Sequence, residues 1–202
     1  MQAPKETKEA FRQLIQGELH PGDGLLVIGN AAAAGTGYLL EKERDRLQGR
    51  FSGAFLEKTS RRVDECRIPP SLITKYQDRA SALLQMGSGG FLSAAWIMAE
   101  AFSLGFYADL RKVPLRQETI EICETLDLDP YKLWSEGAYL AGARDAWGLC
   151  EAVRDEGWEA AVIGSVTAGP GRILKSGSIV RYLSRPDPDE LERWKGGEDG
   201  TI

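Results

Sequence analysis

The residues of this sequence best suited to bind a ligand form a glycine-rich turn, Gly87, Ser88, Gly89 and Gly90, directly before an apolar run that is typical of a helix. Backbone amides at the start of a helix form an anion site, because they point outward and the helix dipole adds positive potential. Such a site needs no side-chain donor, so we predict that this turn can hold a phosphate. The alternative is that the glycines only allow a tight turn from strand to helix.

A second turn, Gly35-Thr36-Gly37, precedes a charged run that we expect to be helical. We assign Gly35 and Thr36 as a further phosphate- or nucleotide-binding position, with the same alternative. No residue requires a cofactor, and the two turns are compatible with a phosphate compound, ATP among them. We assign no catalytic residue and no metal ligand. The single histidine, His20, lies in a turn without an evident catalytic partner.

Composition narrows the class of protein. The chain of 202 residues has a net charge of −5, which argues against nucleic acid or an anionic membrane as a partner, because both require a dense cationic surface. No apolar run approaches the roughly 20 residues of a membrane span, and the N-terminus has no signal-peptide core. The cysteines Cys66, Cys123 and Cys150 have no CxxC spacing and fit free thiols. We therefore expect a cytoplasmic protein.

The sequence predicts both helices and strands, with no internal repeat and no linker-like segment, and we interpret it as one α+β domain. We expect one domain over residues 1–186 and a short helix with a polar tail over 187–202. Small residues at 138–143 and 160–166 indicate strands that pack closely against their neighbours. The helices should cover one side of the sheet, so we expect the other side to be covered by a second copy or a partner protein. The remaining helices are expected at 5–16, 51–65, 71–79, 91–102, 117–126 and 145–156, and a hairpin at 172–183.

Six segments, taken in order, resemble the C-terminal domain of the AIR synthase-related superfamily, and most of all the HypE-like hydrogenase maturation factors. One of them is the Gly35-Thr36 turn with the charged residues 41–46 that follow it. The resemblance implies a mixed sheet flanked by helices, which closes over a separate N-terminal domain that carries metal ligands and much of the ATP site. The other five are 22–29, the turn at 87–90, the block VPLRQETIEICETLDLDPYKL at 113–133, SEGAYLAGA at 135–143 and AVIGSVTAGPG at 161–171.

The sequence departs from the family pattern where chemistry is expected. The family motif His-Asp-x-Thr-x-Gly-Gly corresponds here to a segment with Leu84, Gln85 and Gly87 at the His, Asp and Thr positions. HypE proteins also carry a C-terminal cysteine that accepts a carbamoyl group, whereas no cysteine follows Cys150 in this chain. We also expect a chain of this length to lack the N-terminal ATP- and metal-binding domain.

The resemblance and its departures leave three functions open. The first is a catalytically degenerate stand-alone domain that binds a nucleotide, another phosphate ligand or a protein. The second is one subunit of a split ATP-dependent maturation enzyme or synthase, completed by a separate N-terminal-domain protein. The third is a structural or assembly protein. In each case we expect no activity from this chain alone. Ligand identity, pathway and oligomeric state are not determined by the sequence.

Overall fold

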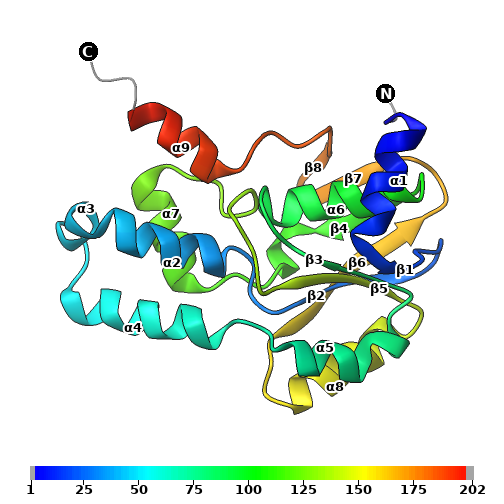
Figure 1. Ribbon diagram of the computed structural model, residues 1–202, viewed down its shortest axis with the longest axis horizontal. Helices are drawn as coiled ribbons and strands as arrows, with labels where there is room; N and C mark the ends of the chain where they lie inside the picture. The colour runs from blue at the N-terminus through cyan, green and yellow to red at the C-terminus, as the bar shows by residue number, and fades with distance from the viewer. Residues whose placement is uncertain (1–2, 199–202) are drawn as a thin grey trace.

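A mixed β-sheet runs through the computed structural model, which describes residues 3–198 of the chain and side chains up to Trp194 (Figure 1). Its strands are β1 (Ile15–Gly17), β2 (Gly24–Ile28), β3 (Ala82–Gln85), β4 (Gly105–Asp109), β5 (Tyr139–Ala143), β6 (Ala160–Thr167), β7 (Arg172–Ser176) and β8 (Ile179–Tyr182). They lie in the order β1-β3-β5-β2-β6-β4-β7-β8. Each neighbouring pair is antiparallel except β4 and β7, which are parallel.

Helices pack around this sheet, which confirms the predicted α+β class with a mixed sheet flanked by helices. They are α1 (Lys5–Gln13), α2 (Ala33–Lys42), α3 (Arg44–Gln48), α4 (Gly53–Glu65), α5 (Pro70–Tyr76), α6 (Gly90–Ala101), α7 (Gln117–Leu126), α8 (Ala146–Asp155) and α9 (Glu190–Glu198), with short 3-10 turns η1 (Gln77–Arg79) and η2 (Leu110–Lys112).

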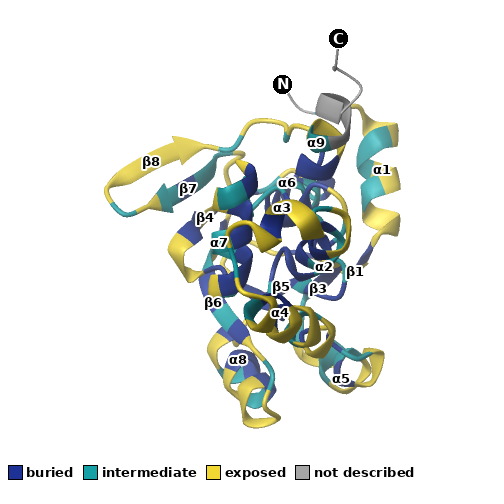
Figure 2. Cartoon of the chain, turned by 90° about the vertical axis from the view of Figure 1, so that its left-hand side faces the viewer, coloured by how far each residue is buried: buried dark blue, intermediate teal, exposed yellow. Residues whose placement is uncertain are grey.

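The central strands are buried on both faces. In β2, Leu25 and Val27 point to the core cluster formed with α1 and α6, whereas Leu26 and Ile28 point to the cluster formed with α5 and α8. The alternation follows from the pleat of a strand, which sends successive side chains to opposite faces. The expectation that helices cover only one side is therefore wrong for the central strands. Figure 2 shows them dark blue, while β8 at the sheet end is exposed.

A third apolar cluster joins α2, α3, α4, α7 and α9 at one end of the sheet (Figure 1). Helix α9 belongs to this cluster, because Leu191 is buried and the Trp194 ring lies edge-on against Tyr38 with centroids 6.3 Å apart. The C-terminal segment thus packs against the domain that we predicted for residues 1–186. The division at residue 186 stays a prediction. Residues 199–202 lie outside the described part.

Most predicted elements are present, with shifted ends. Helix α7 has the expected bounds, and α8 follows the predicted Asp145 cap, whose side chain accepts a hydrogen bond from the amide of Gly148 (3.0 Å). The single helix predicted over 5–16 is wrong: the chain leaves α1 after Gln13 and forms β1, which pairs with β3. Within residues 3–198, no helix combines the length and apolar character that a membrane crossing needs.

Candidate functional site

The turn at residues 87–90 leads from β3 into α6 and requires glycine for steric reasons. Gly89 and Gly90 have φ angles of 76° and 60°, in the left-handed region that disfavours side chains. A Cβ on Gly90 would also lie 2.6 Å from the carbonyl oxygen of Leu133. Gly87 and Ser88 are more accessible and border a cavity of about 490 Å³.

The positive end of α6 already holds an anion from the same chain. The amide of Gly89 donates to Oδ2 of Asp189 over 2.6 Å, and Asp189 is only 3% exposed. Its other oxygen, Oδ1, accepts from the amide of Leu191 (2.9 Å) in the first turn of α9. One carboxylate therefore caps two helix N-termini, an arrangement that both amide groups and the helix dipoles favour. Phosphate binding at the Gly87–Gly90 turn stays a prediction, and at Gly89 it requires Asp189 to be displaced.

Replacing Asp189 with alanine is expected to make the Gly89 amide available to inorganic phosphate. In ¹⁵N-resolved NMR spectra, phosphate should then shift the Gly89 resonance in the variant but not in the wild type at the same concentration. The variant should also lose about 0.5–2 kcal/mol of stability with the cap of α9. Asp187→Ala is the matched control, because Asp187 is exposed and pairs with Lys132 instead (2.8 Å). An equal phosphate shift of Gly89 in the wild type would contradict the proposed competition.

Gly35 and Thr36 lie inside the first turns of α2 and not in a turn before it, because the helix already begins at Ala33. Both are buried. The Gly35 amide donates to the Trp134 carbonyl (2.9 Å), and the Thr36 hydroxyl bonds to the Ala32 carbonyl and to Thr119. Their polar groups thus have partners within the protein, and their phosphate-binding role stays a prediction.

Ser135 links the starts of the two helices. Its hydroxyl accepts from the Ala32 amide at the start of α2 (2.8 Å) and donates to the Leu133 carbonyl, and its own amide donates to the Gly87 carbonyl (3.1 Å). The residue is completely buried. The structure therefore brings both predicted turns against one segment, 133–135. The small polar residue in the SEGAYLAGA motif was the only sequence signal for this junction.

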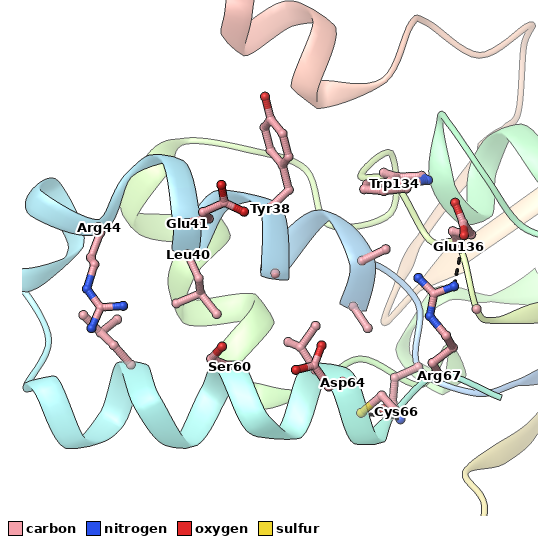
Figure 3. A pocket seen from close by; sticks show the side chains of 17 residues that line it. Tyr38, Leu40, Glu41, Arg44, Ser60, Asp64, Cys66, Arg67, Trp134 and Glu136 are labelled. Carbon is pink, nitrogen blue, oxygen red and sulfur yellow. Dashed lines mark hydrogen bonds and ion pairs between the residues drawn. The ribbon is translucent and has the colours of Figure 1, made fainter. Parts of the chain in front are cut away.

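A groove with a volume of about 790 Å³ lies between α2 and α4 (Figure 3). Arg44 points from the start of α3 toward α4 at one end, and the Arg67–Glu136 ion pair (3.1 Å) lies at the other. Ser60 and Asp64 point from α4 into the space between. The wall is completed by Asn30, Ala33, Ala34, Gly37, Tyr38, Leu40, Glu41, Leu56, Val63, Cys66, Trp134 and Gly137.

Several polar side chains of the groove remain available to bind a ligand. Arg44, Ser60 and Asp64 have no hydrogen bond or ion pair from their side chains to the rest of the described chain, whereas Arg67 and Glu136 are paired but partly exposed. A guanidinium can hold a carboxylate or phosphate in a bidentate way. Sequence reasoning missed Arg44, Ser60 and Asp64, because exposed polar residues on amphipathic helices carry no local signal of their function.

A cysteine with polar partners lies beside the groove. Cys66 is buried, and its Sγ accepts from Nε of Arg116 (3.1 Å) and from the side-chain Nδ2 of Asn30 (3.6 Å). The hydrogen bond to Cys66 raises the pKa of Arg116. The other two cysteines are packed in the core, and burial raises the pKa of Cys123 to about 12. The expectation of free thiols is confirmed for all three.

No cluster of three or more His, Cys, Asp or Glu residues suited to a metal ion occurs in the described range. His20 contacts only Asp23 as a possible ion-pair partner there, with 3.8 Å between Nδ1 and Oδ2. What the geometry assembles is a cavity with hydrogen-bonding and charged groups, suited to binding a small polar molecule.

Comparisons with known proteins agree with this fold. A protein of Methanocaldococcus jannaschii that is named as a hydrogenase expression/formation protein is 28% identical over 179 residues. The match covers 85% of this chain and 50% of that protein. Escherichia coli HypE, a hydrogenase maturation protein, is 25% identical with a TM-score of 0.69 over 87% of this chain and 53% of its own. Two further solved structures share the fold at 19% identity. HypE in complex with ATP has a TM-score of 0.67 over 84% of this chain and 52% of its own. A HypE–HypF complex has a TM-score of 0.62 over 84% of this chain and 54% of the matched chain.

The chain thus spans about half the length of the proteins that it matches. The family described as AIR synthase related protein, C-terminal domain, matches residues 20–176, from the turn before β2 to the end of β7. That range includes the sheet core, α2, α6 and the groove. The chain belongs to the AIR synthase related family, of which it has the C-terminal domain.

Proposed function

We propose that this chain is the ligand-binding half of a HypE-like hydrogenase maturation factor, and that the groove between α2 and α4 takes a nucleotide or a similar phosphate compound. The observation that carries the proposal is the guanidinium of Arg44, which has no ion pair among the described residues and lies at one end of a cavity of about 790 Å³. Cavities of this volume suit small-molecule ligands. The α6 turn is the weaker candidate, because Asp189 occupies it.

The lining of the groove matches the parts of a nucleotide. Arg44 would pair with the phosphates, and the Asp64 and Ser60 side chains could bond to ribose hydroxyls. Trp134 provides an aromatic ring at the other end of the wall, near Glu136. The solved HypE structure with bound ATP supports the choice of ligand, although at 19% identity it establishes only a shared fold. We assign no catalytic residue in the groove.

Arg44→Gln is expected to weaken ATP binding about tenfold, because a charge-assisted hydrogen bond to phosphate is lost. Isothermal titration of ATP and AMP into the wild type and the variant measures this. Arg50→Gln is the matched control, because Arg50 is also exposed, lies shortly after α3 and does not line the groove. Failure of the wild type to bind either nucleotide, or equal losses in both variants, would remove the proposal.

A second function is favoured by the coverage of the relatives. The chain matches only about half of each, and HypE is also found in a complex with HypF. Both observations support a domain that acts with other protein parts, as in a split ATP-dependent enzyme. We expect no ATP hydrolysis by this chain alone, because phosphoryl transfer relies on metal ions held by carboxylates. A phosphate-release assay on the purified chain, with magnesium present, tests that expectation.

A further inference from the structure

The sheet continues beyond the helices that cover its centre. Phe106 and Leu174 point into the core shared with α6, so Tyr107 and Ile173, which alternate with them, face the opposite side. On that side α8 covers β2, β5 and β6 but leaves β4, β7 and β8 open, and Tyr107 remains 37% exposed. In Figure 2 the β7–β8 hairpin extends away from the helices. The end of the sheet is thus an open surface.

Strand β8 forms the free edge of the sheet, with β7 as its only neighbour in the described part. The Leu183 amide donates to the Arg172 carbonyl over 2.8 Å. Alternate residues of an antiparallel strand direct their backbone groups to opposite sides. The backbone amides and carbonyls of Val180 and Tyr182 therefore point away from β7, toward the free edge. They can pair with an incoming strand.

The side chains of β8 are apolar on one face of the sheet and mixed on the other. Val180 and Tyr182 share the face of Ile173 and are 60% and 76% exposed. Ile179 and Arg181 alternate with them on the opposite face, and Ile179 is 67% exposed. Natural edge strands are usually protected by charges, proline or a covering element. On β8 the only charge is Arg181, and three of its four side chains are exposed and apolar. Such an edge is typical of a surface that receives a partner.

Charge indicates which partner fits. Residues 160–186 contain four cations and no Asp or Glu, in a chain whose net charge is −5. Arg172 is consumed by an ion pair with the buried Glu100. Lys175, Arg181 and Arg185 have no ion pair with the described residues. Two copies of this basic hairpin would repel each other at a shared edge, whereas an acidic segment would be attracted.

We propose that β8 docks an extended segment of a partner protein in which acidic residues alternate with apolar ones. Such a segment adds to the edge as a further strand, and its backbone bonds to Val180 and Tyr182. The pleat sends alternate side chains to opposite faces, so its apolar residues lie beside Val180 and Tyr182 while its acidic residues lie beside Arg181. The proposal is independent of ligand binding in the groove, which lies between other elements.

The probe is a short synthetic peptide in which valine alternates with glutamate, titrated into ¹⁵N-labelled protein. We expect NMR shifts at β8 and slower hydrogen exchange of the Val180 and Tyr182 amides. A peptide with lysine in place of glutamate should bind about tenfold more weakly, because like charges face each other across the strands. Absence of shifts at β8 at millimolar peptide, or equal binding of both peptides, overturns the proposal.

Val180→Pro removes an amide that points to the edge without breaking a bond to β7, so the hairpin should persist. It should abolish peptide binding, whereas Val180→Thr, which keeps the amide and a β-branched side chain, should retain it. Arg181→Glu should reverse the preference between the two peptides. Light scattering over a dilution series tests whether a second copy of this chain occupies β8 instead. A wild-type dimer that Val180→Pro abolishes would show that a second copy covers β8. That result would overturn the assignment of an acidic partner.

Discussion

Replacing Glu100 with alanine is expected to lower the free energy of unfolding by about 3–5 kcal/mol, the cost of leaving a buried charge without its partner. Glu100 is 1% exposed on α6 and forms a hydrogen-bonded ion pair with Arg172, whose side chain is 10% exposed. The Ala3 amide (2.6 Å) and Nζ of Lys8 (3.6 Å) also contact the carboxylate. Nε of Arg172 has no hydrogen-bond partner in the described residues, so the guanidinium depends on Glu100.

The same ion pair should make stability depend on acid pH. Burial acts to raise the pKa of Glu100, but the hydrogen bonds from Arg172 and Ala3 and the charges of Arg172 and Lys8 outweigh it, so the pKa is lowered. A carboxyl group whose pKa is lower in the folded state stabilises the protein fully above its unfolded pKa of about 4.3. That contribution is lost as the pH falls below this value and through the folded pKa.

Urea denaturation at neutral pH and again at acid pH measures both effects. The difference between wild type and Glu100→Ala should be large at neutral pH and shrink below about pH 4. Glu9→Ala is the matched control, since Glu9 is exposed on α1 and should change stability by less than about 0.5 kcal/mol. A Glu100→Leu, Arg172→Met double variant that is as unstable as Glu100→Ala would contradict the ion-pair explanation, because removing both charges should recover much of the loss.

Gly90→Ala is expected to cost about 2–5 kcal/mol, the sum of left-handed backbone strain and overpacking. Its φ of 60° disfavours a side chain, and the new Cβ would lie 2.6 Å from the Leu133 carbonyl oxygen and 2.8 Å from that of Tyr131. Both neighbours are backbone atoms, which cannot turn aside as a flexible side chain can. The loop that carries Tyr131 and Leu133 should therefore be displaced from the start of α6.

Gly87→Ala is the matched control within the same turn. A Cβ on Gly87 would meet no atom within 4 Å, and its φ is not in the left-handed region. We expect a change of less than about 0.5 kcal/mol, or a slight gain from the less flexible unfolded chain. Thermal and urea unfolding of the two variants measure the difference. Equal stabilities would show that Gly90 is retained for another reason than the packing of this turn.

Patterns among residues close together in the sequence determined most of the helices and strands. The apolar run after Gly90 forms α6, the Asp145 cap begins α8, and the strand predicted at 138–143 is present as β5 (Tyr139–Ala143). These features depend on periodicity, capping and steric limits among near neighbours in the sequence, so a single sequence displays them. The ordered motifs likewise predicted the family, which the match over 20–176 confirms.

The candidate site depended on contacts between distant segments. Asp189 meets Gly89 from far along the chain, and Ser135 joins the starts of α2 and α6. Arg44 and Asp64 face one groove only because α3 and α4 pack against α2. Because the residues of each such contact are far apart in the sequence, no local pattern indicates that they meet. The sequence alone therefore determined the glycines that permit the turns. The tertiary packing of α9 placed a carboxylate of the same chain at the α6 turn, and the packing of α4 against α2 formed the groove.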